Sequence, residues 1–208
     1  MIIETIEERF MGENTYILGD EKTKKCAVID PGASIIDILN VIEKHQFTVE
    51  YIILTHGHGD HISQAPEVKR RTNAKIVAHV KEEEVLIDRV KNLSSQLPGP
   101  LVEFDADIYV DEGDVIELGS LKLKIIHTPG HTKGGMSIKV GENIFTGDTL
   151  FAGSIGRTDF YGGDYKQIMK SLRKLAKYDD NAVVYPGHGP SSTIGVEKRV
   201  NPYMQQII

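Results

Sequence analysis

Residues 55–61 constrain this chain more than any other stretch, because three histidines and an aspartate fall within six residues. Directly before them stands the apolar run 51–54, which predicts a buried strand. The histidines would then lie on the loop at the carboxyl end of that strand. Active sites of layered α/β proteins commonly occupy such strand ends. The stretch therefore predicts a layered fold with a functional site at this loop.

The spacing within this loop indicates metal binding. His56 and His58 are two residues apart, so in extended backbone their side chains point the same way and can hold one ion. The two intervening glycines allow the loop to bend and to bring Asp60 and His61 back toward the same point. Four such groups are too crowded to close around one ion as a tetrahedron, whereas two ions roughly 3.5–4 Å apart fit the geometry. A polar loop with surface histidines is the alternative.

The same four residues resemble the H-x-H-x-D-H signature of the metallo-β-lactamase superfamily. Three further motifs resemble that family in the same order: its third-ligand loop at 128–132, its bridging-aspartate loop at 147–150 and its last histidine motif at 186–189. Segments 150–153 and 156–159 resemble the glyoxalase II-like branch. The resemblance covers essentially the whole chain and implies an α/β fold, the four-layer αββα sandwich.

The resemblance also implies the full set of metal ligands. They are His56, His58 and His131 for one ion, Asp60, His61 and His188 for the other, and Asp148 as the bridge between them. All offer nitrogen or oxygen, so we expect two divalent ions, Zn²⁺ first, with Fe or Mn²⁺ as alternatives. Asp30, in a turn signal after a predicted strand, matches a family aspartate that orients ligand groups. A role in the turn alone is the alternative.

These ligand types predict hydrolysis. A water between two cations has its pKa lowered toward neutrality and can attack a carbonyl carbon, while one ion stabilises the oxyanion. Asp60 and Asp148 are the expected catalytic residues, and Asp60 would orient the nucleophile. The glyoxalase II-like motifs imply a thioester, with the glutathione thioester S-D-lactoylglutathione as the expected substrate. Arg157 and Tyr161 are expected substrate contacts; the alternatives are an ion pair with a nearby acid and simple packing.

One departure from the glyoxalase II-like branch concerns the thiol carrier. Longer members carry a C-terminal helical domain that helps to bind glutathione, whereas this chain ends twenty residues after His188 (208 minus 188). We therefore expect a carrier that differs from glutathione or is loosely recognised.

A persulfide dioxygenase of the same fold is the main alternative function. Persulfide dioxygenases of this superfamily use one iron, held by residues that match His56, His131 and Asp148. They also carry a Gly-Arg-Thr-Asp segment. A β-lactamase is disfavoured, because in the commonest types a cysteine replaces Asp148. A non-enzymatic metal-binding protein is disfavoured by the complete ligand set.

Charge and cysteine content limit the binding partners and the cellular compartment that we expect. The net charge of −6, from 24 basic and 30 acidic residues, argues against a nucleic-acid surface. Cys26 is the single cysteine, so no intramolecular disulfide can form, which suits a reducing compartment. We see neither a signal peptide nor an apolar run near the ~20 residues of a membrane span. We expect one cytoplasmic domain over residues 1–208, with a small-molecule substrate and no nucleic-acid or membrane partner; the oligomeric state stays open.

Periodicity places the remaining elements. Strands are predicted to deliver each ligand motif, and helices are predicted from a cap at Ser34, from about 62 to 71, over 81–90 and from Tyr165 along an apolar face. Residues 92–107 lack periodicity and are interpreted as a loop that could cover the site. His45 is expected to be a solvated residue near a helix end, without a ligand role.

Overall fold

Two six-stranded sheets form the centre of the molecule in the computed structural model, which describes residues 1–207. The first sheet runs in chain order: β1 (Ile2–Glu7), β2 (Asn14–Gly19), β3 (Lys25–Ile29), β4 (Thr48–Ile53), β5 (Lys75–His79) and β6 (Ile108–Val110). Its first three strands pair antiparallel, and β3 to β6 pair parallel. The carboxyl ends of the parallel strands therefore meet at one edge, where the histidine-rich loop begins.

The second sheet holds the later motifs. Its strand order is β14 (Ser192–Thr193), β13 (Val183–Pro186), β10 (Asn143–Gly147), β9 (Met136–Val140), β8 (Leu121–His127) and β7 (Val115–Leu118). Only the β10–β13 pair is parallel. A separate short hairpin joins β11 (Leu150–Phe151) to β12 (Ser154–Ile155).

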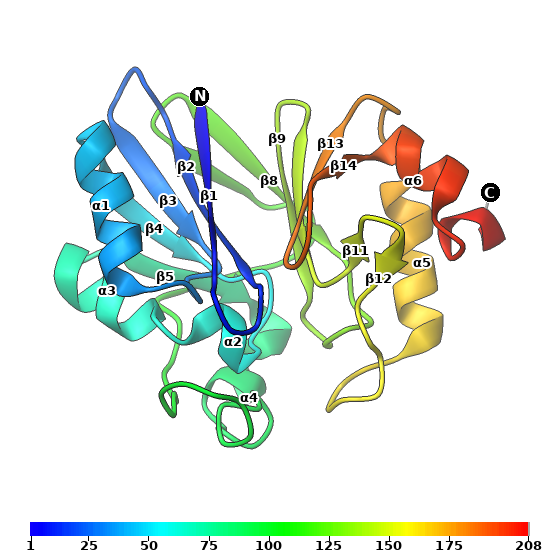
Figure 1. The fold of residues 1–208 in the computed structure, drawn as a ribbon, viewed down its shortest axis with the longest axis horizontal. Coiled ribbons are helices and arrows are strands. Elements are labelled where there is room, and N and C mark those ends of the chain that lie inside the picture. Colours follow the sequence, from blue (N-terminus) through cyan, green and yellow to red (C-terminus); the bar gives the residue numbers. More distant parts are fainter. Residues whose placement is uncertain (208) are drawn as a thin grey trace.

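Helices cover the two outer faces (Figure 1). On the first sheet lie α1 (Ile35–His45) and α3 (Ala65–Thr72), and on the second lie α5 (Tyr165–Leu175) and α6 (Ile194–Val200). Shorter turns are α2 (Gly59–Ile62), α4 (Glu83–Leu86) and the 3₁₀ segments η1 (Val80–Glu82) and η2 (Met204–Gln206). The predicted αββα sandwich is thus confirmed, and within residues 1–207 no helix has the length and apolarity to cross a membrane.

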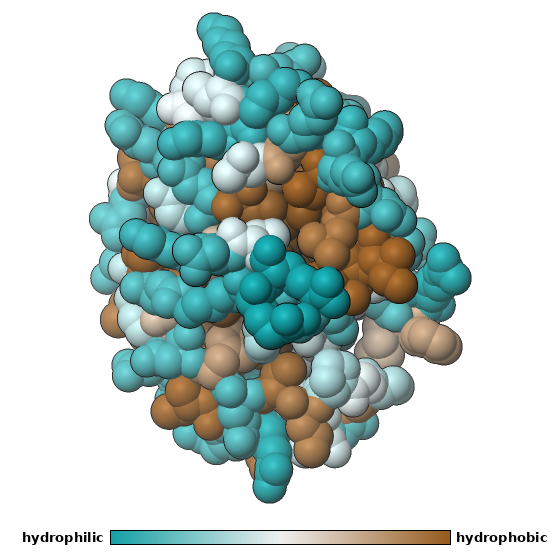
Figure 2. Space-filling model, turned by 90° about the vertical axis from the view of Figure 1, so that its left-hand side faces the viewer, coloured by the Kyte–Doolittle hydropathy of each residue, from teal (hydrophilic) through white to brown (hydrophobic). Residues whose placement is uncertain are grey.

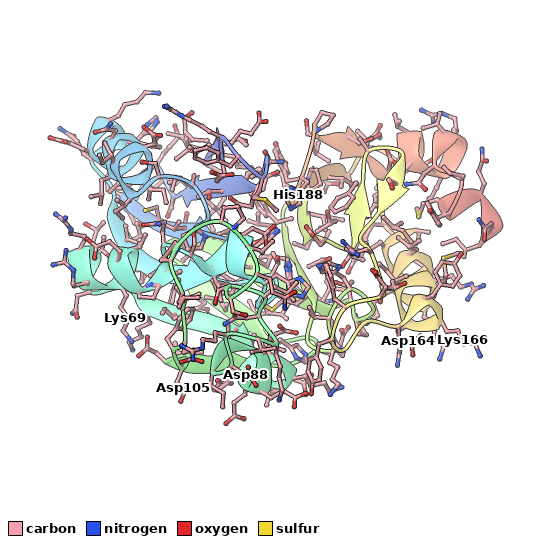
Figure 3. All side chains as sticks on the ribbon, turned by 60° about the horizontal axis from the view of Figure 1, so that its bottom comes forward. Lys69, Asp88, Asp105, Asp164, Lys166 and His188 are labelled. Carbon is pink, nitrogen blue, oxygen red and sulfur yellow. The ribbon has the colours of Figure 1, made fainter. Side chains whose placement is uncertain are left out.

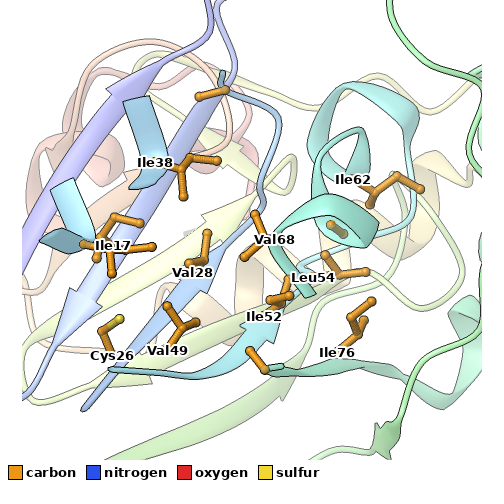
Figure 4. Packing of buried hydrophobic residues seen from close by; sticks show 14 of the residues in the cluster. Ile17, Cys26, Val28, Ile38, Val49, Ile52, Leu54, Ile62, Val68 and Ile76 are labelled. Carbon is orange, nitrogen blue, oxygen red and sulfur yellow. The ribbon is translucent and has the colours of Figure 1, made fainter. Parts of the chain in front are cut away.

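Strand alternation explains why the layers stack. On β2, Ile17 packs under the helices, whereas Tyr16 and Leu18 face the second sheet. One core therefore lies between the first sheet and its helices, where Ile38 and Ile52 are fully buried (Figure 4). A second core lies between the sheets, and a third lies under α5 and α6. The outer face of the α1 and α3 layer is mostly hydrophilic, with hydrophobic groups gathered near its middle (Figure 2).

Four local predictions need correction. The helix expected over 62–71 is two helices, because Pro66 stands in the first turn of α3, where a helix starts. The helix expected over 81–90 ends at Leu86, and the structure begins it with a 3₁₀ turn. Ser34 occupies the N-cap position of α1, but its side chain makes no capping bond. Tyr165 is 46% exposed and lies off the apolar face of α5.

The expectations for His45 and for the loop 92–107 differ in part from the structure. His45 is half-buried; its Nε2 lies 2.6 Å from Glu4 Oε1 and its ring stacks on Phe47, so it is not simply solvated. The irregular segment 92–107 is anchored at its base, where Asn92 is fully buried and its carbonyl accepts the N–H of Gly59 over 2.7 Å. A covering role for its outer part stays a prediction.

Candidate metal centre

The histidine-rich loop is held from below by one buried carboxylate. Asp30 is 1% exposed and accepts the backbone N–H of Thr55 over 2.7 Å and the Thr55 hydroxyl over 2.5 Å. It also accepts a bond from Nδ1 of His61 over 3.0 Å. A carboxylate can only accept, so this bond holds a proton on Nδ1 of His61 and leaves Nε2 as the ring nitrogen that faces the site.

Three imidazoles form the first cluster. His56, His58 and His131 are buried, and one ring nitrogen from each lies within 4.8 Å of the others. Nδ1 of His58 and Nε2 of His131 approach to 2.8 Å. Nδ1 of His131 lies 2.7 Å from the Arg157 carbonyl, which can only accept, so the Nε2 of His131 carries the lone pair. The nitrogens therefore converge on one point.

A second cluster lies alongside and combines two imidazoles with a carboxylate. Nε2 of His188 is 3.3 Å from Oδ2 of Asp60 and 3.3 Å from Nε2 of His61. His188 lies near the middle of the molecule, between its two halves (Figure 3). Its loop is tied to the first sheet by Asn14, whose side chain donates to the carbonyls of Pro186 and Gly189.

Asp148 stands between the two clusters. Its Oδ1 lies 3.3 Å from Nε2 of His61, and its Oδ2 lies 3.4 Å from Nε2 of His131 and 3.8 Å from Nε2 of His188. Oδ2 thus approaches a nitrogen of each cluster, and Oδ1 approaches a second nitrogen of the His61 cluster. This is the placement that a bridging ligand would need.

The electrostatics prepare the first cluster to accept a cation. Burial lowers the pKa of His58 to about 3 and that of His56 well below its ordinary value, so both rings are neutral near pH 7. Burial alone would raise the pKa of Asp148, but the nearby charge of His61 holds that pKa well below the usual range. Neutral imidazoles and ionised carboxylates are the forms that ligate metal.

Unpartnered buried atoms indicate the same use. Among the described residues, Nε2 of His56 and Oδ1 of Asp148 are buried and have no well-formed hydrogen bond. Such orphaned polar atoms are costly unless an ion or another partner satisfies them. The donor set of imidazoles and carboxylates without thiolate fits Zn²⁺, Fe or Mn²⁺.

The two expected substrate contacts lie beyond the clusters. Arg157 forms a two-pronged ion pair with Asp159 at 2.7 and 2.6 Å and lies over the Phe160 ring. Phe160 in turn contacts the ring of His58 edge-on. Tyr161 donates to Glu84 over 3.0 Å and is 40% exposed. Neither role is tested by these contacts.

Sequence reasoning missed two buried carboxylates beside the site. Glu13 lies 4.0 Å from Nδ1 of His61, and its segment forms a β-bridge with His188. Glu82 is fully buried and accepts backbone bonds from two loops of the first cluster. Glu82 sits within a run of charged residues that indicates an exposed helix, so only the burial reveals it.

Comparison with known proteins agrees with this geometry. The family model described as the metallo-beta-lactamase superfamily matches residues 9–188. "Hydroxyacylglutathione hydrolase GloC" of Haemophilus influenzae is 34% identical, over 98% of each chain.

Solved structures are similar over nearly the whole chain. The BLEG-1 B3 metallo-beta-lactamase aligns with a TM-score of 0.91 at 32% identity, covering 98% of this chain and 99% of that one. ETHE1 of Myxococcus xanthus aligns with a TM-score of 0.83 at 32% identity, covering 97% and 84%. TTHA1623, solved in a di-iron-bound form, aligns with a TM-score of 0.85 at 27% identity, covering 98% and 100%.

Proposed function

The chain belongs to the metallo-beta-lactamase superfamily, and we propose that it is a dinuclear metal-dependent hydrolase of acyl thioesters, with hydroxyacylglutathione compounds such as S-D-lactoylglutathione as the substrate class. The observation that carries the proposal is the pair of clusters on either side of Asp148. A mononuclear site would need only one of them. The second cluster has three residues that can ligate a metal, and in both clusters the ligand atoms lie within 4.8 Å of one another.

We propose that His56, His58 and His131 hold one ion, that Asp60, His61 and His188 hold the other, and that Asp148 bridges them. When bound, two such ions lower the pKa of a water and polarise a carbonyl oxygen. Asp60, with 12% of its side chain exposed, would also orient the nucleophile. Asp30, which accepts from Nδ1 of His61, would keep Nε2 of that ring directed at the ion.

An apolar recess beside Asp60 supports the proposal that the substrate is a small organic molecule. It measures about 550 Å³ and lies between the loop after β1 and the proline turn 98–100. Phe10, 87% exposed, and Ile36, 66% exposed, contribute to its walls. Exposed apolar side chains around a polar reaction centre are typical of a ligand site. Arg157 remains a proposed contact for an anionic thiol carrier, provided that it releases Asp159.

The test is loss of the S-D-lactoylglutathione thioester, followed in air and without oxygen, on protein analysed for metal. Turnover without oxygen, with about two ions per chain, is the expected result. Asp148→Ala is the control: it removes the proposed bridge and should abolish turnover and lower bound metal. Oxygen-independent turnover that survives in Asp148→Ala would contradict the dinuclear scheme.

The second candidate is a mononuclear iron persulfide dioxygenase of the same fold. The similarity to ETHE1 at 32% identity favours it. It would hold iron through His56, His131 and Asp148 and would consume oxygen with a persulfide substrate. One iron per chain, no thioester turnover and oxygen uptake with glutathione persulfide would establish it over the hydrolase.

A further inference from the structure

Glu82 joins the two loops that supply the three histidines of the first cluster. The backbone N–H of Gly57, between His56 and His58, donates to Oε2 of Glu82 over 2.8 Å. The backbone N–H of Gly134, three residues after His131, donates to Oε1 over 2.7 Å. The first loop leaves β4 in one sheet, and the second leaves β8 in the other. A single carboxylate therefore spans both sheets at the metal centre.

The fit around Glu82 is close on both sides. A Cβ atom at Gly57 would lie 2.9 Å from Oε2 of Glu82, and one at Gly134 would lie 2.7 Å from Cγ of Glu82. The added atom at Gly134 would also lie 2.7 Å from the backbone nitrogen of Glu82, so this loop needs glycine to approach the carboxylate, whereas at Gly57 the atoms met belong to side chains.

A carboxylate is costly at this depth, which indicates a specific use. Glu82 is 0% exposed, and burial raises its pKa to about 7 despite hydrogen bonds from Gly134 and Gly57. Its two bonds come from peptide N–H groups that would otherwise be left in the interior without acceptors. An apolar side chain could fill the volume, but it could not join the two loops.

We propose that Glu82 is a positioning residue. By accepting hydrogen bonds from the N–H groups of Gly57 and Gly134, it fixes the position of the His56–His58 loop relative to the His131 loop, and so controls metal affinity at the three-histidine cluster. It touches neither the proposed ion nor the substrate. The inference rests on the proposed metal centre and is independent of which substrate is hydrolysed.

Glu82→Gln tests this at constant volume. The amide keeps one acceptor oxygen, and its NH₂ group faces the other peptide N–H, so one loop is released. Orienting groups around metal ligands typically contribute about 10–100-fold to affinity. We expect a loss of this size in one of the two metal-binding steps, measured by Zn²⁺ competition with a chromophoric chelator. Glu83→Gln, the same change at the exposed neighbouring residue, should leave both steps unchanged.

Two reference variants assign the affected step. His131→Ala weakens the step of the first cluster, and His188→Ala weakens that of the second. Glu82→Gln should match His131→Ala in the step affected, and at saturating Zn²⁺ its KM for the thioester should be unchanged while kcat falls. Equal weakening of both steps, weakening of the His188 step, or a result like that of Glu83→Gln would overturn the proposal.

A measurement on the unaltered chain covers the case in which Glu82→Gln does not fold. With ¹⁵N-labelled glycine, the amide protons of Gly57 and Gly134 should both be protected from solvent exchange in the metal-free protein. Rapid exchange of either one would overturn the proposal. Failure of the hydrolase proposal would appear separately, as absent thioester turnover in protein whose metal-binding steps still depend on Glu82.

Discussion

Replacing Asp30 by asparagine tests the support of the second cluster most sharply. Asp30 has a φ of +48°, in the left-handed region that asparagine tolerates better than other non-glycine residues. The change therefore removes the charge without a large backbone penalty. One Asp30 oxygen accepts the Thr55 N–H, and the other accepts both the Thr55 hydroxyl and Nδ1 of His61.

The magnitude follows from these contacts. An amide has one acceptor oxygen, so either the Thr55 N–H or the His61 Nδ1–H loses its acceptor. A buried donor left unpaired costs about 1–3 kcal/mol. If His61 instead moves its proton to Nε2 and accepts from the amide, its lone pair no longer faces the site. Since 1.4 kcal/mol is about tenfold, we expect metal affinity at the second cluster to fall about 10–100-fold.

Chelator competition with Zn²⁺ measures the affinity, and Asp30→Ala serves as the comparison. Alanine adds the left-handed backbone penalty of roughly 1–2 kcal/mol. For a chain of this size that lowers Tm by about 2–8 °C below that of Asp30→Asn. Two Zn²⁺ equilibria within twofold of the unaltered protein in Asp30→Asn would refute the reasoning, because His61 would then not depend on the carboxylate.

Three other predictions address different parts of the chain. His45→Ala should cost about 1 kcal/mol in stability and leave turnover intact, because the half-buried ring contacts Glu4 and Phe47 and no residue of either cluster; a large activity loss would show a role in the site. Although burial opposes it, neighbouring carboxylates hold the pKa of His61 well above its ordinary value, so an ion at its cluster must displace a proton. Calorimetry should therefore show that affinity falls by about tenfold per pH unit as the pH drops below that pKa. An ion bound with no proton release would contradict this. Arg157→Gln should raise KM for a glutathione thioester without changing bound metal, since only the backbone carbonyl of Arg157 contacts a cluster residue; an unchanged KM would remove Arg157 from the substrate site.

The strands were the most predictable part of the fold. The apolar run at 75–79 is β5, and Gly119, a residue typical of hairpin turns, lies between β7 and β8. Their alternation or apolar run is local, so it can be read without knowledge of the partner strand. The helices were less predictable where tertiary contacts decide their ends: α4 stops at Leu86, and α6 carries a glycine and was missed.

The site likewise contains residues that local sequence predicts and residues that it does not. Four of its residues lie within 56–61, and their spacing alone indicates a metal site. His131 and His188 meet them from 73 and 127 residues away, so their place followed from the family resemblance and not from spacing. Glu82 could not be found from sequence, because its neighbours are charged and only its hydrogen bonds to both loops show that it points inward.

Anomalous X-ray diffraction from crystals loaded with Zn²⁺ tests the central claim most directly. The account predicts two peaks, one within the His56, His58 and His131 cluster and one within the Asp60, His61 and His188 cluster, with Asp148 contacting both. A single peak at full occupancy under excess Zn²⁺, or a second peak away from Asp148, would contradict it.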